Sequence, residues 1–318
     1  MQIKRQLKAV LVSEALLLLA TINSGRMASG ATGSPPPPTQ AHYRFTTVDI
    51  PDQVFMGVGA PNAEGVACGY YIDTEGNDHG FLWRDGKVTI LDAPGWVDTA
   101  LTGINDLGVV SGVYSDGQEL SYAFLYRISD GTWTQLPTLP GTPVQGNTVL
   151  NNEGIVAGQA SEGDWVDSYD AVGWIWDGKS YSFFTVPGAS ESGVGTIPLG
   201  INNRGQVTGF YADDSGTWHG FLRDHKSIST FDVPGADLTK PFGINDEGDI
   251  VGCYFIFSPT FVEQGFILHE GHFLTFEVPG SGGLAGINNQ GVMGGCYADS
   301  NGIWHGFIAT PEGCGDKR

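Results

Sequence analysis

Charged residues are scarce in this sequence, and cationic ones are scarcer still. Charged residues make up 16% of the chain, and 15 Lys and Arg stand against 35 Asp and Glu, which gives a formal net charge of −20. Such a surface repels polyanions, so nucleic acid and anionic membranes are poor partners. Scarce charge together with 48 glycines disfavours long surface helices and favours many short strands joined by tight turns.

Cysteine is also scarce, and the common catalytic signatures are missing. The four cysteines form neither a compact disulfide framework nor a paired CxxC metal site, so we expect small buried thiols. The chain contains no GxSxG elbow, no HExxH and no phosphate-binding loop, so none of the enzyme classes that these motifs mark is supported. The cysteines are Cys68, Cys253, Cys296 and Cys314.

The N-terminal segment is typical of an export signal. Three cations precede an apolar run over residues 9–22 that is short for a bilayer span. We therefore predict a signal peptide over residues 1–31 and a secreted protein, extracellular or periplasmic, with no membrane span in the mature chain. The proline-rich stretch that follows predicts a stiff linker over residues 32–42. The remaining residues, 43–318, are predicted to form one domain.

A repeat organises this domain. The unit Gly-Ile-Asn-(Asp or Asn)-x-Gly occurs four times, and two degenerate copies complete a set of six. Each unit divides into four short strands separated by Asn-Asp-x-Gly or Asp-Gly turns. Four strands in about 43 residues is the size of a β-propeller blade. The units begin at residues 60, 103, 149, 200, 243 and 286.

The two ends of the repeat region complement each other. The sixth unit stops after its third strand, at 307–310, and the missing fourth strand is predicted at 44–50. Pro51 precedes the first unit by the same nine residues that separate Pro94 and Pro234 from the units that follow them. An open ring would leave unpaired sheet edges. The sequence thus predicts an all-β, six-bladed β-propeller of four-stranded antiparallel blades, with the N-terminal strand closing the last blade.

The repeat unit also carries a resemblance. The pattern GIN-(D/N)-x-G, then HGF, then FDVPG resembles the extracellular repeat family named after its His-Ala-Phe motif. The resemblance covers residues 43–314, with His-Gly-Phe in place of His-Ala-Phe and Tyr122-Ala-Phe124 as the nearest variant. It implies export and a propeller-like repeat, and it supplies no catalytic residues.

The recurring polar residues fit structural roles. His79, His219 and His305 recur at equivalent positions, so we predict that they are buried and lock each blade internally through a hydrogen bond. The aspartates of the Tyr-x-Asp-x-x-Gly segments are predicted to close turns. Calcium is the ion that their oxygens would suit, but no complete calcium loop is present, so we expect no metal site and no cofactor.

The third repeat unit is longer than the others. The third unit has four extra residues between its second and third strands and four more after its last proline. Both insertions are predicted to lie on one face of the ring, and they bring aromatic and carboxylate side chains suited to a sugar or a cation. The candidate ligand-binding residues on segments 161–171 and 188–199 are Asp164, Trp165, Asp167, Tyr169, Asp170 and Glu191. The alternative location is the mouth of the central channel, near Trp96, Asp98 and Lys240.

Two functions remain open from the sequence. The first is a binding module for an extracellular glycan, a small molecule or a protein. The second is an extracellular polysaccharide hydrolase or lyase, in which Asp164, Asp167, Asp170 and Glu191 would supply the acid and the base. The lack of a distinctive catalytic triplet favours binding. We expect a monomer.

Overall fold

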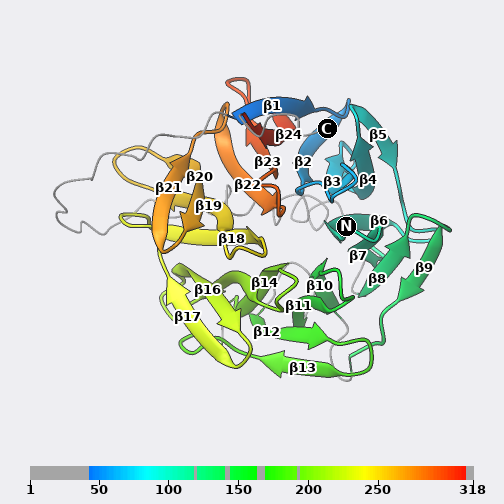
Figure 1. The fold of residues 1–318 in the computed structure, drawn as a ribbon, viewed down its shortest axis with the longest axis horizontal. Helices are drawn as coiled ribbons and strands as arrows, with labels where there is room; N and C mark the ends of the chain where they lie inside the picture. The colour runs from blue at the N-terminus through cyan, green and yellow to red at the C-terminus, as the bar shows by residue number, and fades with distance from the viewer. Residues whose placement is uncertain (1–42, 118–119, 140–143, 163–168, 192–193, 313–318) are drawn as a thin grey trace.

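Six blades of β-strands surround a central axis, as Figure 1 shows in a view along that axis. The structure is a computed structural model, and it describes residues 43–117, 120–139, 144–162, 169–191 and 194–312. Within these ranges every regular element is a β-strand. The predicted signal peptide and linker lie outside the described residues.

Each of the first three blades contains four antiparallel strands in sequence order, from the axis outward. The second and third blades are also joined by one parallel pair, between Ser121 and Val144. The first blade comprises β2 (Gln53–Val58), β3 (Ala67–Asp73), β4 (Asp78–Arg84) and β5 (Lys87–Ile90). The second comprises β6 (Asp98–Ile104), β7 (Val109–Ser115), β8 (Ser121–Arg127) and β9 (Thr132–Gln135). The third comprises β10 (Val144–Leu150), β11 (Val156–Glu162), β12 (Tyr169–Trp176) and β13 (Tyr181–Phe184).

The last three blades follow the same plan, except that the sixth takes its outer strand from the start of the domain. The fourth comprises β14 (Thr196–Ile201), β15 (Val207–Ala212), β16 (Trp218–Asp224) and β17 (Ser227–Phe231). The fifth comprises β18 (Leu238–Ile244), β19 (Ile250–Ile256), β20 (Val262–His269) and β21 (His272–Phe276). The sixth comprises β22 (Ser281–Ile287), β23 (Met293–Ala298), β24 (Trp304–Pro311) and β1 (Tyr43–Val48).

The N-terminal strand closes the ring. β1 pairs antiparallel with β24 over six residue pairs, from Tyr43 opposite Pro311 to Val48 opposite Gly306. Val48 is buried against Met56 of the first blade and Ile308 of the sixth. The predicted six-bladed propeller with an N-terminal closing strand is therefore confirmed.

The asparagine of the Gly-Ile-Asn motif joins neighbouring blades. Its Oδ1 accepts hydrogen bonds from the N–H groups two and four residues later, as the motif predicts for a turn. Its Nδ2 donates to the main-chain oxygen of the equivalent residue in the next blade, as from Asn105 to Asn151 at 3.0 Å. Asn288 continues the series across the seam between the sixth and first blades by donating to the Pro61 oxygen at 2.9 Å. The motif is both a turn and a joint between blades.

The residue after that asparagine forms a second series of hydrogen bonds between neighbouring blades, which we call the second belt. Its side-chain oxygen accepts from the backbone N–H of the equivalent residue in the preceding blade, as Asp106 does from Ala63 at 2.7 Å. Asn289 accepts from Asp246 in the same way at 2.8 Å. Ala63 has no side-chain acceptor, so the corresponding bond from the Asn289 N–H cannot form. The second belt is open at the seam.

The glycine nine residues after each repeat start marks a close approach between strands. A Cβ at Gly112 would collide with the main-chain oxygen of Ala100 on the inner strand, and the same holds for Gly69 and the Gly57 oxygen. The small residue lets the second strand approach the inner one.

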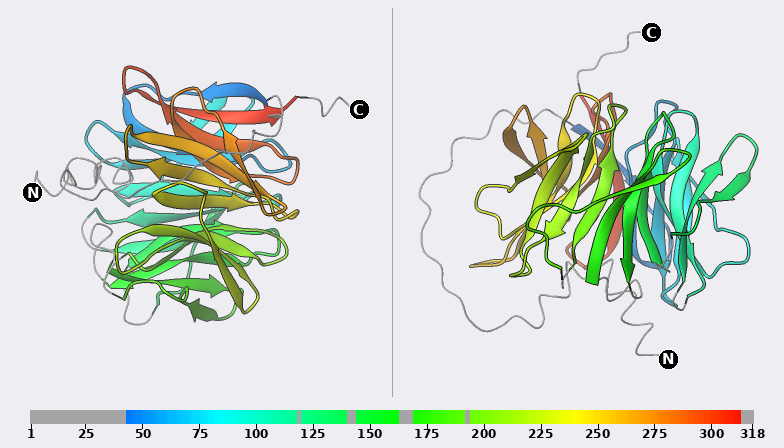
Figure 2. Two further views of the ribbon diagram at one scale, coloured as in Figure 1. Left: turned by 90° about the vertical axis from the view of Figure 1, so that its left-hand side faces the viewer. Right: turned by 90° about the horizontal axis from the view of Figure 1, so that it is seen from below.

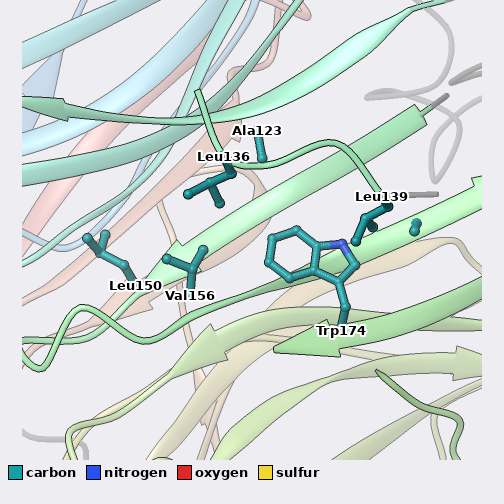
Figure 3. Close-up of a cluster of buried hydrophobic side chains, with 7 residues drawn as sticks. Ala123, Leu136, Leu139, Leu150, Val156 and Trp174 are labelled. Carbon is teal, nitrogen blue, oxygen red and sulfur yellow. The ribbon is translucent and has the colours of Figure 1, made fainter. Parts of the chain in front are cut away.

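The core lies within and between the blades. In Figure 3, Trp174 of the third blade lies among aliphatic side chains, including Leu136 and Leu139 of the segment that follows the second blade. The phenylalanine of the His-Gly-Phe motif occupies the equivalent place in other blades, where full burial of such a ring contributes about 2–3 kcal/mol. The fully buried phenylalanines at this position are Phe81, Phe124, Phe221, Phe266 and Phe307.

The ring has two distinct faces, which the side views in Figure 2 present edge-on. We call the side with the Gly-Ile-Asn turns the asparagine face. We call the opposite side, where second-to-third-strand loops meet the connections between blades, the connection face.

Candidate functional site

The connection face of the third blade carries the two predicted insertions, and the structure describes their bases. Glu191 is exposed on the connection to the fourth blade. Outside the described part of the chain lie Asp164, Trp165 and Asp167, together with the side chains of Tyr169 and Asp170.

The described bases of the two insertions lie against each other. Gly195 has φ +69°, and a Cβ there would collide with the main-chain oxygen of Ala171, so this crossing requires glycine. The Ser190 N–H donates to the Ala212 oxygen at 2.8 Å, and the Ala212 N–H donates to the Gly195 oxygen at 3.2 Å. These bonds fix the second insertion against the fourth blade.

Two buried polar groups directly precede the first insertion. Gln159 is 8% exposed and Ser161 is 2% exposed, and within the described chain neither Gln159 Oε1 nor Ser161 Oγ has a hydrogen-bond partner. Both residues share the side of β11 that carries Ala157, which packs against Val207 and Phe221 of the fourth blade. An unpaired buried polar atom costs about 1–3 kcal/mol. The hydrogen-bonding capacity of these two oxygens is therefore unused within the described chain.

An apolar cluster links the insertion bases to the fourth blade. Ala171 and Ile197 pack with Phe210, and Val194 and Trp218 pack against this group. The Phe210 and Trp218 ring centroids are 4.9 Å apart. The cluster thus joins Ala171 of the third blade to the aromatic pair Phe210 and Trp218 of the fourth blade.

Lys240 of the fifth blade extends over this aromatic surface. Its Nζ lies 5.2 Å from the Phe210 ring centroid, 5.4 Å from that of Trp218 and 5.0 Å from that of Phe242. In the described ranges no carboxylate lies within ion-pair distance of this ammonium group. Burial lowers the pKa of Lys240.

Glu263 and two thiols surround the base of Lys240. Ser281 donates to a Glu263 oxygen at 3.3 Å, and burial raises the pKa of the Glu263 carboxyl despite this bond and the nearby Lys240. Burial also raises the pKa of Cys253, and that of Cys296 to about 12, so both thiols stay protonated at neutral pH. Both are free, as is Cys68, so the expectation of unbridged thiols is confirmed for these three residues.

Trp96 and Asp98 lie elsewhere in the ring. Trp96 stacks on Tyr114 with centroids 4.3 Å apart, and the buried Asp98 accepts a hydrogen bond from Ser115 Oγ at 2.6 Å. Both residues belong to the second blade, whereas Lys240 belongs to the fifth, three blades away.

The repeated histidines lock their own blades, as predicted, but they are not buried. His79 Nδ1 lies 2.9 Å from Asp92, its Nε2 lies 3.2 Å from Asp73, and its ring stacks on Tyr71. The side chain remains 26% exposed, because both aspartates come from loops of the connection face. Burial would lower the pKa of His79, but the two carboxylates outweigh it and raise that pKa. His219 and His305 have equivalent arrangements.

The predicted turns at the connection face are confirmed. Asp73, Asp213 and Asp299 each accept hydrogen bonds from N–H groups two and four residues later. Among the residues with described positions, no group of three or more His, Cys, Asp or Glu is arranged to hold a metal ion. The same part of the chain contains no helix with the length and apolarity that crossing a membrane requires.

The sequence analysis missed most of the aromatic surface around Lys240. Phe210 and Trp218 belong to the fourth blade and Phe242 to the fifth, and only the ring places them around one ammonium group. A signal for Lys240 itself was present in the repeat frame. The five equivalent positions hold small or aliphatic residues: Gly57, Ala100, Gly146, Ile197 and Gly283.

Comparisons with known proteins give the fold and no family. No family model matches the sequence, and no curated protein does either. The lectin SapL1, in complex with alpha methyl fucoside, is similar with a TM-score of 0.56 and 11% identity over 82% of this chain and 94% of that chain. A gluconolactonase from Xanthomonas campestris is similar with a TM-score of 0.53 and 14% identity over 91% of this chain and 99% of that chain.

A third similar structure is a propeller domain with an open velcro topology. The β-propeller domain of the Trilobed protease from Pyrococcus furiosus, reported with an open velcro topology, has a TM-score of 0.51 and 9% identity over 81% of this chain and 96% of that chain. At these identities the likeness concerns the fold alone. The present chain is a six-bladed β-propeller whose last blade is closed by β1.

Proposed function

We propose that this protein is an exported propeller that binds a carbohydrate on the connection face of its third to fifth blades. The observation that carries the proposal is the pair of buried oxygens, Gln159 Oε1 and Ser161 Oγ, without partners in the described chain. Sugar hydroxyls supply the donors and acceptors that such atoms lack. Trp218, which is half-buried and packs on the buried Phe210, adds an apolar surface against which a sugar ring can pack.

Other observations support export and sugar binding. The N-terminal pattern is that of a signal peptide, and the repeat resembles the extracellular family named after its His-Ala-Phe motif. The lectin SapL1 shares the fold and is in complex with a fucoside, so a propeller of this kind is a suitable scaffold for a sugar site.

The alternative is a polysaccharide hydrolase or lyase at the same face. One observation favours it: burial raises the pKa of Glu263, as a general acid requires. Its charged neighbour in the described chain is Lys240, however, whereas glycoside hydrolysis usually needs a second carboxylate. Binding is therefore the better-supported function. If wild type, but not Glu263→Gln, released reducing ends or unsaturated sugars from a polysaccharide, the enzyme would become the better-supported function.

A glycan array with residues 32–318 tests the proposal. Replacing segments 161–171 and 188–199 by their fourth-blade counterparts should leave folding intact, because the counterparts supply the equivalent strand ends of a blade, and should abolish the glycan signal. Ser300→Ala, in the exposed loop between β23 and β24, is the matched control and should bind like wild type. A loop-replaced protein that keeps its glycan signal would place the site elsewhere.

A further inference from the structure

Lys240 is a half-buried cation with no carboxylate within ion-pair distance in the described chain. The protein has more than twice as many acidic as basic residues, yet the Lys240 ammonium faces three aromatic rings at 5.0–5.4 Å from their centroids. Cation–π contacts offset only part of the cost of removing an ammonium group from water. A bound anion would complete its surroundings.

The blade does not need a lysine at this position. Each of the other five blades has Gly, Ala or Ile there, and all six share the same pairing between the first and second strands. A residue that differs from the small or aliphatic residues at the equivalent positions, at a cost in stability, is characteristic of a functional site. The structural frame therefore does not explain Lys240.

The neighbours of Lys240 define the kind of anion. The polyanions of nucleic acids are disfavoured by a net charge of −20, and one ammonium group matches one negative charge. Trp218 and Phe242 supply apolar surfaces beside it, and Ser281 supplies a hydroxyl on the adjoining sixth blade. We propose that Lys240 binds the carboxylate of a sugar acid, so that the ligand of the connection face carries a uronate. This inference rests on the proposed sugar-binding function and names its ligand class.

The groups around Glu263 give this binding a pH dependence. Lys240, Cys253 and Cys296 are the titratable groups that face Glu263 from the strands around it, and both thiols are neutral at physiological pH. A uronate beside Lys240 is repelled by an ionised Glu263 and not by a protonated one. Affinity should therefore fall as the pH rises through the raised pKa of Glu263, and Glu263→Gln should remove this fall.

Calorimetric titration with matched sugars tests the inference. The probes are the methyl glycosides of glucuronate, galacturonate and mannuronate, each compared with its neutral parent hexoside. We expect wild type to bind at least one uronoside about tenfold or more tightly than its neutral parent. Lys240→Met should abolish this preference, so that the uronoside binds no more tightly than its neutral parent, and Lys240→Arg should retain part of it. The control Lys226→Met removes an exposed lysine and should change nothing.

The outcomes separate the two claims. Neutral sugars that bind as tightly as the uronosides, or a preference that survives in Lys240→Met, would overturn the uronate inference and leave sugar binding intact. Failure of every sugar to bind wild type would overturn the proposed function and this inference together. If Lys240→Met does not fold, the pH profiles of wild type and Glu263→Gln decide, because a flat wild-type profile contradicts the arrangement described.

Discussion

Asp49 and His305 are 256 residues apart in the sequence, and their side chains lie 2.7 Å apart, from the Asp49 carboxylate to His305 Nδ1. Asp49 directly follows the closing strand β1, and His305 lies near the start of β24. In the first and fourth blades the equivalent contacts join residues only 13 positions apart. The same lock that completes a blade locally is used here to close the ring.

Removing the closing strand should destroy cooperative folding. Deletion of residues 32–51 exposes the edge of β24 and removes Val48, whose burial alone contributes about 2 kcal/mol. We expect loss of a single thermal transition and the formation of oligomers through the open edge, measured by calorimetry and size-exclusion chromatography. Asp52→Asn, an exposed change just beyond the strand, is the control. A truncated protein that melts like wild type and stays monodisperse would disprove the closure model.

The histidine lock should make stability depend on pH with a defined sign. The pKa of His79 is raised in the folded state, so its contribution is fully present below the ordinary value of 6.5 and is lost as the pH rises through the folded pKa. The pKa of Asp73 is lowered by hydrogen bonds that outweigh its burial, so its contribution is present above 3.8 and lost as the pH falls through the folded pKa.

Chemical denaturation of His79→Asn at two pH values measures this effect. The variant should lose about 1 kcal/mol of unfolding free energy at pH 5.5, as for a partly exposed hydrogen bond to a charged group, and less at pH 9. His225→Asn, at an exposed turn, should lose little at either pH. An equal loss at both pH values would show that the charge of His79 contributes nothing.

The gap in the second belt can be filled. In Ala63→Asn the new Oδ1 would accept from the Asn289 N–H, as Asn289 itself accepts from Asp246. We expect a gain of about 1 kcal/mol in unfolding free energy, measured by denaturant titration. Ala63→Leu changes the side chain without adding an acceptor and should give no gain. Equal stabilities of the two variants would contradict the role assigned to the belt.

Stability and binding should respond in opposite directions at Gln159 and Ser161. The double change Gln159→Leu and Ser161→Ala removes two buried polar atoms without partners in the described chain, so the melting temperature should stay equal or rise by a few degrees. Affinity for the glycan identified on the array should fall about tenfold or more. A variant that loses stability and keeps its affinity would show that the two groups serve the fold instead.

The repeat frame predicted the fold because each blade is specified locally. In the fourth blade, for example, the four short strands predicted for each unit are observed at Thr196–Ile201, Val207–Ala212, Trp218–Asp224 and Ser227–Phe231. The joints between blades were not predicted. Asn105 was read as a turn residue, and the sequence does not reveal that its amide also reaches Asn151 in the next repeat.

The site was harder to predict than the fold because its residues come from different blades. The surroundings of Lys240 combine Phe210 and Trp218 from the fourth blade with Phe242 from the fifth, and Glu263 with Ser281 from the sixth. These residues converge only after the ring has formed. The histidines were expected to be buried because they recur at equivalent positions of the repeat, but their aspartate partners hold them at the connection face.

The pairing of β1 with β24 sets how the domain responds to a mechanical load. Tyr43, where β1 begins, lies opposite Pro311, where β24 ends, so a force pulling the two chain ends apart acts at one end of this ladder. The hydrogen bonds of the pair are then loaded one after another, as in a zipper, and do not share the load in shear. The ring should open at its seam under a small force while the other five blades stay folded, and a single-molecule pulling record should show this opening as an early, separate step.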